Sequence, residues 1–534
     1  MSKIGHYLQE HIMGEVISAT DARRHFATDA SIFSMAPALI VYPQNENDVR
    51  KVARFSWQLA ERNRIVPITA RGSGTDQAGA AIGNGLMMVF PAHMNRIVEL
   101  DAKTGHATVE PGINYGKLQQ TLMTHGRFLP PYPASLEYST VGGAVANNAS
   151  GEKSVKYGDT RSFVRGLRVV LANGEVITTH RLSKREVNKK LGLATFEGEI
   201  YRSLDTLIEE NQQVIAASEL QVSKNSAGYD LLDVKRKDGS IDLTPLFVGS
   251  QGTLGVITEI TLETESHEPQ TTLLIAAMDS VQQLQTAVLE LRKLSETPSA
   301  IELIDGNLIT TVRASHPNLL KNVIDKPYPK FVLLVEFDGK ESAQKKGAKA
   351  ARKLFDKHAS SYRQEHDLEK QSELWKIRHL SGVLAAHHEG GKKALPIIED
   401  SVVPANKLGE LLQATYDMFA RYKLPVAVWG HAGDGNLHLQ PYLDLSQIGD
   451  RQKAFKLMDD YYRMVISLGG STSGQGNDGR LRAPYLKELY GNEMYAVFQK
   501  LKRIFDPYGT LNPGVKVDVT TEDIKPLVRN EFTV

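Results

Sequence analysis

Two histidines stand at the ends of a short glycine-rich segment that could direct both rings toward one ligand. His431 and His438 enclose the sequence Ala-Gly-Asp-Gly-Asn-Leu, which contains Asn436. Imidazole is a common ligand of zinc and iron, and a bent loop can bring two rings onto one ion. Histidines at this spacing also occur in structural and surface roles, so the spacing alone leaves both interpretations open.

Two glycine-rich turns, far apart in the sequence, indicate a second kind of chemistry. They are Arg71-Gly72-Ser73-Gly74-Thr75 and Ser139-Thr140-Val141-Gly142-Gly143. Glycine lets the backbone approach a ligand closely, and exposed N–H groups in such turns can cradle phosphate oxygens. Neither turn belongs to a G-x-G-x-x-G or G-x-x-x-x-G-K-[ST] motif. We interpret them as two halves of one pyrophosphate cradle, which implies a dinucleotide; the alternative is two ordinary turns.

The elements around the first turn predict an α/β beginning. The β-branched residues Ile65, Val66 and Ile68 predict a buried strand that leads into the turn. An earlier strand is expected over 38–42, followed by a helix that Asn45 or Asn47 would cap. Beyond this region, short apolar runs separated by Gly, Asn and Asp predict strands at 87–90, 97–100, 107–109, 167–171 and 176–179. Helices are expected at 114–126 and within 184–225.

The second half alternates strands with amphipathic helices, which predicts an antiparallel sheet with helices on one face. The expected strands are 273–278, 300–304 and 331–337, and the expected helices are 281–295, one near 307, and 342–358. A further strand at 426–430 would carry His431.

The overall composition sets limits on the function. A chain of 534 residues is too long for one core and predicts two or more domains. The net charge of +1 gives no reason to expect nucleic acid. The absence of cysteine excludes disulfides, cysteine nucleophiles and iron–sulfur clusters ligated within this chain. No apolar run approaches a transmembrane segment, and the first residues lack the apolar core of a signal peptide, so we expect a cytoplasmic protein.

Several motifs together resemble a known family. The segments are 67–75, 139–143, 148–151, 156–161 and 248–257, and they extend the two turns described above. In this order they resemble the FAD-linked D-2-hydroxyacid dehydrogenases, such as D-lactate and D-2-hydroxyglutarate dehydrogenases, which have the vanillyl-alcohol-oxidase or PCMH-type FAD fold. The resemblance implies an α+β fold with a PCMH-type FAD-binding domain of two α/β subdomains and a substrate domain built on an antiparallel sheet.

The resemblance also implies domain limits and an FAD site. We expect an N-terminal helical extension at 1–36, the FAD-binding domain at 37–265, the substrate domain at 266–480, and a C-terminal segment at 481–534 that returns to the FAD site. The residues expected to bind FAD are Arg71, Gly72, Ser73, Gly74, Thr75, Asp76, Pro133, Ser135, Ser139, Thr140, Gly142, Gly143, Asn148, Ser150, Gly151, Tyr157, Gly158, Ile257 and Asn512.

The resemblance assigns roles to the histidine segment and shows one departure. In the family both histidines bind a divalent metal. The residue at the position of Asn436 helps to hold the substrate, and an arginine at the position of Arg378 binds the substrate carboxylate. The family completes the metal site with Ser-Gly-Glu-His-Gly, whereas this chain has Ser473-Gly474-Gln475-Gly476-Asn477. The third ligand is therefore Gln475, a neutral amide, and the proposed histidine base is a glycine.

Because of this departure, we expect a zinc, iron or manganese ion to be held only loosely. Asp478 and Glu399 are alternative carboxylate ligands, although a role in local hydrogen bonds is the simpler interpretation of each. His387 and His388 follow Arg378 on a polar stretch that we expect to be exposed.

The expected activity is oxidation of a D-2-hydroxy acid to the 2-oxo acid, with hydride passing to flavin N5. Without cysteine there is no relay of sulfur clusters in the chain, so electrons would pass to an external quinone, electron-transfer flavoprotein or cytochrome. The protein could form a homodimer and could associate peripherally with the inner membrane. Two alternatives remain: an FAD enzyme like the ether-lipid synthases, or a catalytically impaired flavoprotein, because Gln475 and Gly476 alter the site.

Overall fold

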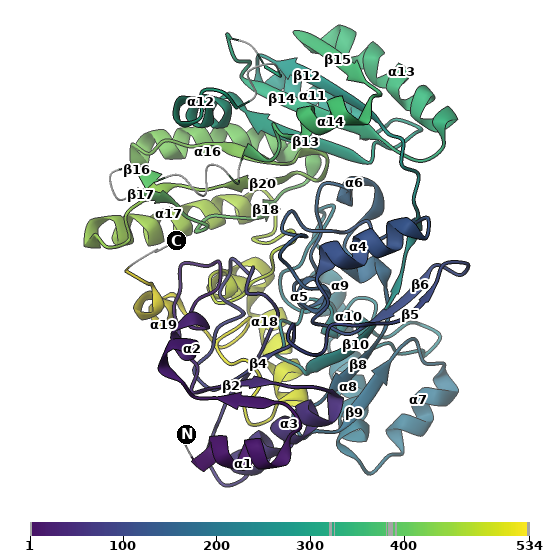
Figure 1. Ribbon diagram of the computed structural model, residues 1–534, viewed down its shortest axis with the longest axis vertical. Helices are drawn as coiled ribbons and strands as arrows, with labels where there is room; N and C mark the ends of the chain where they lie inside the picture. Colours follow the sequence, from purple (N-terminus) through teal and green to yellow (C-terminus); the bar gives the residue numbers. More distant parts are fainter. Residues whose placement is uncertain are drawn as a thin grey trace.

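A computed structural model describes residues 3–319, 323–324, 326–380, 382, 388–389 and 392–530. Figure 1 shows two lobes. The lower lobe holds the N-terminus and the four- and five-stranded sheets, the upper lobe is built around the seven-stranded sheet, and the C-terminus lies between the lobes near α17. None of the helices in these ranges combines the length and the apolar character needed to cross a bilayer.

The first sheet has four strands in the order β1-β2-β4-β3. They are β1 (Glu15–Ile17), β2 (Leu39–Tyr42), β4 (Leu86–Val89) and β3 (Ile68–Arg71). β4 pairs in parallel with both β2 and β3. Helix α3 (Glu46–Ala60) follows β2, and the Asn45 side chain caps it by accepting from the Asp48 N–H. The predicted strand into the first turn exists, but it starts at Ile68, and Ile65 is 49% exposed rather than buried.

The N-terminal stretch contributes a strand to this sheet. It contains α1 (Lys3–His11), β1 and α2 (Thr20–His25), and β1 pairs antiparallel with β2. The stretch expected to be a helical extension is thus partly built into the first sheet.

The second sheet is antiparallel, with the order β5-β6-β10-β8-β9. Its strands are β5 (Ile97–Asp101), β6 (His106–Val109), β10 (Val256–Glu263), β8 (Val164–Val170) and β9 (Val176–Thr179). β8 and β9 lie at two of the predicted strand positions and form a hairpin around Asn173-Gly174, where Gly174 has a φ of 86°. Helices α4 (Tyr115–Thr124), α7 (Lys184–Leu191), α8 (Phe196–Glu210) and α9 (Gln212–Ala217) accompany this sheet.

The third sheet has seven strands, and all of its pairs are antiparallel. In order across the sheet these are β15 (Ser361–Glu365), β12 (Thr272–Met278), β14 (Phe331–Phe337), β13 (Ala300–Asp305), β19 (Val428–His431), β20 (Asn436–Leu439) and β18 (Ser401–Val402). The antiparallel sheet was predicted, but the expectation of helices on one face only is wrong.

Alternate residues of the central strands pack into two separate cores. Leu274 and Leu333 join the core formed with α11 (Val281–Leu291) and α13 (Glu341–His358). Their neighbours Leu273 and Leu334 join the core formed with α12 (Gly306–Ser315) and α14 (Leu368–Trp375). Because side chains alternate between the faces of a strand, both faces of this sheet are covered.

The remaining α-helices and strands of the described residues include two small sheets, β11-β7 and β16-β17-β21. They are β7 (Arg127–Phe128), α5 (Val141–Asn147), α6 (Ser154–Tyr157), α10 (Thr244–Phe247), β11 (Glu265–Ser266), β16 (His388–Glu389), β17 (Lys392–Ala394), α16 (Leu408–Tyr422), β21 (Tyr442–Leu443), α17 (Ile448–Ser467), α18 (Leu486–Phe505) and α19 (Thr521–Ile524).

The C-terminal segment returns to the first sheet, in the lower lobe of Figure 1. After α18, the Ile68 N–H donates to the Thr510 carbonyl at 2.7 Å, and the Asn512 N–H donates to the Ile68 carbonyl at 2.8 Å. Leu511 therefore forms a parallel bridge with Ile68, directly before the first glycine turn.

Candidate active site

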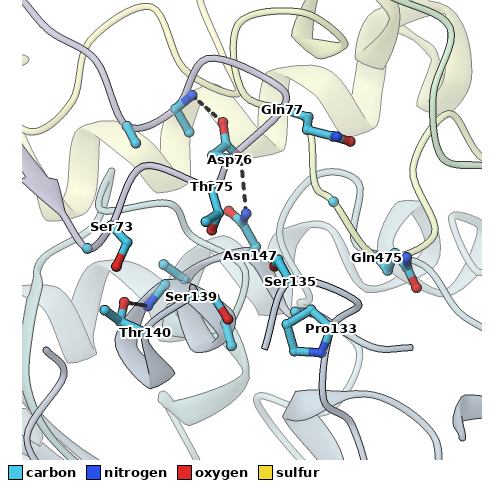
Figure 2. Close-up of a pocket in the computed structure, with 18 of the residues that line it drawn as sticks. Ser73, Thr75, Asp76, Gln77, Pro133, Ser135, Ser139, Thr140, Asn147 and Gln475 are labelled. Carbon is cyan, nitrogen blue, oxygen red and sulfur yellow. Dashed lines mark hydrogen bonds between the residues drawn. The ribbon is translucent and has the colours of Figure 1, made fainter. Parts of the chain in front are cut away.

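A cavity of about 360 Å³ joins the two glycine turns to the β19–β20 hairpin. Many residues expected to bind FAD or substrate line it. They are Arg71, Gly72, Ser73, Gly74, Thr75, Asp76, Pro133, Ser135, Ser139, Thr140, Gly142, Gly143, Ser150, Ile257, Arg378, His438 and Gln475. Figure 2 shows Ser73 near Thr140 and Ser139 at one end, and Gln475 at the other.

The first turn offers its backbone to the cavity. Among the residues the structure describes, the N–H groups of 72–77 donate no hydrogen bond to protein. Gly74 has a φ of +78°, a conformation that favours glycine. A Cβ on Gly72 would lie 2.2 Å from Thr140 Oγ1, so the two turns pack directly together. Adjacent free amides of this kind suit phosphate oxygens.

The second turn contributes differently. The Gly142 N–H donates to the Pro111 carbonyl at 2.8 Å, and the Gly143 N–H donates to Thr140 Oγ1 at 3.1 Å. The backbone amides of Gly142 and Gly143 are thus already hydrogen-bonded within the protein. These glycines would instead let a ligand come close to the backbone. The Ser139 hydroxyl is buried without a partner. The free amides of the first turn and this hydroxyl fit the pyrophosphate of FAD, although the two turns are not equivalent halves.

Asp76 holds the first turn in shape. Its Oδ2 accepts from the N–H groups of Ala78 and Ala80, and its Oδ1 accepts from Asn147 Nδ2 at 3.0 Å (Figure 2). Burial, with Asp76 nearby, raises the pKa of Asp29 to about 7. Asn147 was not among the residues predicted to bind FAD, although it lies in an amide-rich stretch after the second turn.

Five residues expected to bind FAD do not line the cavity. They are Asn148, Gly151, Tyr157, Gly158 and Asn512. The side chains of Asn148, Tyr157 and Asn512 form hydrogen bonds within the protein instead. Asn148 ends α5 in a left-handed conformation and donates to Asp159. The Tyr157 hydroxyl donates to Asp338. The Asn512 amide donates to the carbonyls of Ala80 and Gln251.

The β19–β20 hairpin places the two histidine rings next to each other. The ring centroids are 5.2 Å apart and the planes are nearly perpendicular. His431 Nδ1 lies 2.7 Å from Glu302 Oε1, and His438 Nδ1 lies 2.5 Å from Glu399 Oε1. Each Nδ1 therefore carries its proton and donates to a carboxylate. Glu399 thus plays the hydrogen-bonding role that was one of its two predicted interpretations.

Glu302 joins His431 to Arg378. Arg378 Nε donates to Glu302 Oε2 at 2.5 Å, and this carboxylate is fully buried. Burial raises the pKa of Glu302, and the Arg378 charge opposes that shift. Burial, followed by the charges of Lys224 and Arg378, holds the pKa of His431 well below its ordinary value, which makes this ring neutral. Sequence patterns missed Glu302, because it lies within the apolar strand β13.

Gln475 contacts His438 with its nitrogen. Its Nε2 lies 3.2 Å from His438 Nε2, whereas its Oε1 accepts from Lys224 Nζ at 3.1 Å and from Ser150 Oγ at 3.2 Å. Within the described ranges no group of three His, Cys, Asp or Glu side chains could hold a metal ion. An amide N–H₂ is not a metal ligand, so this donor set does not fit the expected zinc, iron or manganese ion.

The other candidates for the metal and substrate sites are engaged elsewhere. Asp478 pairs with Lys516 at 2.8 Å, where both side chains are fully buried, and accepts from the Gly228 N–H. Asn436 donates to Asp400 and to the Ser401 carbonyl and does not line the cavity. His387 lies outside the described residues.

Comparisons with known proteins agree with this arrangement. Residues 37–180 match the family described as FAD binding domain, and residues 268–515 match FAD linked oxidases, C-terminal domain. The chain is 29% identical over 524 residues to D-2-hydroxyglutarate dehydrogenase of Escherichia coli (strain K12), a match that covers 95% of this chain and 50% of that protein. It is 27% identical over 506 residues to D-lactate dehydrogenase of Archaeoglobus fulgidus, covering 94% and 96% respectively.

Solved structures with the same fold are more distant in sequence. p-Cresol methylhydroxylase with substrate bound has a TM-score of 0.69 at 14% identity, covering 95% of this chain and 94% of that one. Alkyldihydroxyacetonephosphate synthase has a TM-score of 0.64 at 17% identity, covering 96% and 85%. These likenesses concern the fold alone.

Several of the D-2-hydroxyglutarate dehydrogenases that match are about twice as long as the matched region. The chain therefore spans about half the length of these relatives. The chain contains an FAD binding domain followed by the C-terminal domain of FAD linked oxidases, within an α+β fold that has antiparallel sheets.

Proposed function

We propose that the protein oxidises a D-2-hydroxy acid to the corresponding 2-oxo acid. The observation that carries the proposal is the single cavity lined by the free amides of the first glycine turn at one end and by Arg378 and His438 at the other. One end suits a pyrophosphate, and the other suits a small carboxylate with an adjacent hydroxyl.

FAD would supply the redox chemistry by accepting the hydrogen on Cα as hydride. The first turn would hold its pyrophosphate, and Ser139 and Thr140 would lie against it. The chain's own side chains would then have to bind the substrate carboxylate and remove the hydroxyl proton as the carbonyl forms.

Arg378 is the residue that we assign to the substrate carboxylate. Its Nε is fixed by Glu302, and a guanidinium carries further N–H donors on its two terminal nitrogens. A planar guanidinium can grip a carboxylate with two parallel bonds. Glu302 therefore positions the arginine from behind, and the side chain lines the cavity.

Glu399 is the acceptor that we assign to the substrate hydroxyl. It lines the cavity, and its Oε2 is buried without a partner, whereas its Oε1 is held by His438. A carboxylate in this position accepts a hydrogen bond from the hydroxyl and can take its proton. The chain has no cysteine for an internal relay, so a quinone, an electron-transfer flavoprotein or a cytochrome would reoxidise the flavin.

The test is anaerobic reduction of the bound flavin by a panel of D- and L-2-hydroxy acids, followed as loss of the yellow absorbance. D-lactate, D-2-hydroxyglutarate and their L-enantiomers should form the first set. We expect at least one D-acid to bleach the flavin and its L-enantiomer to leave it oxidised. Dithionite serves as the control that the flavin is reducible. An FAD-loaded protein that dithionite bleaches but no hydroxy acid bleaches would contradict the proposed activity.

A further inference from the structure

A buried lysine, Lys224, lies on the opposite side of the Gln475 amide from His438. Lys224 is 6% exposed, and its Nζ has three hydrogen-bond acceptors: Ser150 Oγ at 3.2 Å, Ser154 Oγ at 3.2 Å and Gln475 Oε1 at 3.1 Å. Asp434 lies 3.7 Å away and balances the charge. An ammonium has three N–H donors and no lone pair, so these three acceptors use all of its hydrogens.

This arrangement determines which end of the Gln475 amide faces the histidines. The ammonium can only donate, so the carbonyl oxygen must point toward Lys224 and the N–H₂ must point away. On the other side, His438 donates from Nδ1 to Glu399, which leaves a lone pair on Nε2. Gln475 Nε2 lies 3.2 Å from His438 Nε2 and donates to its lone pair. The amide is therefore oriented by a hydrogen bond at each end.

We propose that Lys224 is a positioning residue that turns the Gln475 amide toward His438 and so withdraws two donor atoms, Gln475 Oε1 and His438 Nε2, from any metal ion at the histidine pair, which leaves the pair metal-free although His431 Nε2 has no hydrogen-bond partner among the described residues. The Lys224 ammonium donates to Gln475 Oε1, the amide atom that could otherwise bind a metal ion. The Gln475 Nε2 group donates to His438 Nε2, whose lone pair could otherwise bind a metal ion. The positive charge beside the substrate end of the cavity then comes from Lys224 and Arg378.

The proposal makes a prediction that separates Lys224 from Gln475. In Gln475→Glu, the new carboxylate would form an ion pair with Lys224 and remain a poor ligand. In the double variant Lys224→Met/Gln475→Glu, the carboxylate is released to join His431 and His438, which gives two imidazoles and one carboxylate, a set that zinc accepts.

Zinc affinity is measured by isothermal titration with zinc chloride and by elemental analysis after gel filtration, on FAD-loaded protein. We expect wild type and Gln475→Glu to retain no stoichiometric zinc. The double variant should bind one zinc per chain at least about tenfold more tightly than Gln475→Glu, the scale typical of residues that orient ligands. Lys224→Arg/Gln475→Glu is the matched control, because it keeps the charge and should behave like Gln475→Glu.

Retention of FAD and an unchanged melting temperature check the fold of each variant. If the methionine variant does not fold, Lys224→Gln replaces it, because glutamine also lacks the charge. Tight, stoichiometric zinc in the wild type that His438→Asn abolishes would overturn the proposal. Equal zinc affinity in Gln475→Glu and the double variant would overturn the role of Lys224. The assay needs no turnover, so its result is independent of the proposed activity.

Discussion

Replacement of Arg378 by lysine tests the substrate end of the site. Arg378 has to serve two anions, the fully buried Glu302 and the proposed substrate carboxylate. The guanidinium can do this because Nε donates to Glu302 while the terminal nitrogens remain for a second carboxylate. A lysine ammonium is a single point, and the nearer fixed charge is Glu302.

The expected loss follows from that geometry. Arg378→Lys keeps the charge but gives up one of two charge-assisted contacts, and such a hydrogen bond contributes about 1.5–3 kcal/mol. At 1.36 kcal/mol per factor of ten, kcat/KM for flavin reduction should fall roughly ten- to a hundredfold or slightly more. The loss should appear mainly as a higher concentration of the hydroxy acid needed for half-maximal flavin reduction, because the affected contact is to the substrate.

Stopped-flow reduction of the flavin under anaerobic conditions measures this effect. Lys376→Arg is the matched control: Lys376 lies two residues earlier, is half-exposed, and forms a surface ion pair with Glu373. It should leave the reduction rate unchanged. An Arg378→Lys protein that keeps FAD and the full wild-type kcat/KM would show that Arg378 does not bind the substrate.

Three further predictions concern FAD and the first turn. The purified protein should be yellow, and acid precipitation should release the flavin into the supernatant because no cysteine is present for a thioether link; flavin that stays with the pellet would contradict this. Gly72→Ala should weaken FAD retention in a gel-filtration assay, since its Cβ would lie 2.2 Å from Thr140 Oγ1, whereas Gly449→Ala, where a Cβ meets nothing within 4 Å, should not. Equal retention in these two variants would refute the close packing of the turns. The buried Asp29, with a pKa raised to about 7, holds its proton more tightly in the folded state than in the unfolded state. The free energy of unfolding should therefore fall as pH rises from about 4 to about 7, by up to about 4 kcal/mol, and denaturant titrations should show a smaller fall in Asp29→Asn.

The fold could be predicted well because burial and periodicity are visible in the sequence. Short apolar runs between glycines located most strands of the first two sheets, and the order of motifs indicated the two matched domains. The second layer of helices on the third sheet was missed, although β14 carries a signal for it. Its seven residues are all buried, and such an unbroken run is typical of a strand covered on both faces.

The site was harder to predict because its properties depend on which buried groups meet. Nothing local to Glu302 indicates that it receives hydrogen bonds from both Arg378 and His431. Likewise, the sequence shows that Gln475 replaces a glutamate, but not that Lys224 holds its oxygen. These contacts join residues more than seventy positions apart, and only the folded arrangement determines them.

The parallel bridge between Leu511 and Ile68 has a consequence for biosynthesis. Ile68 emerges from the ribosome hundreds of residues before the segment that completes its side of the sheet. Domains usually fold as they are synthesised, N-terminal parts first. Here the nascent first sheet keeps unpaired backbone groups on β3, next to the cofactor turn, until the segment around Leu511 has been synthesised. Stable loading of the flavin should therefore wait for that segment, and a ribosome-bound chain stalled at residue 505 should not retain the flavin.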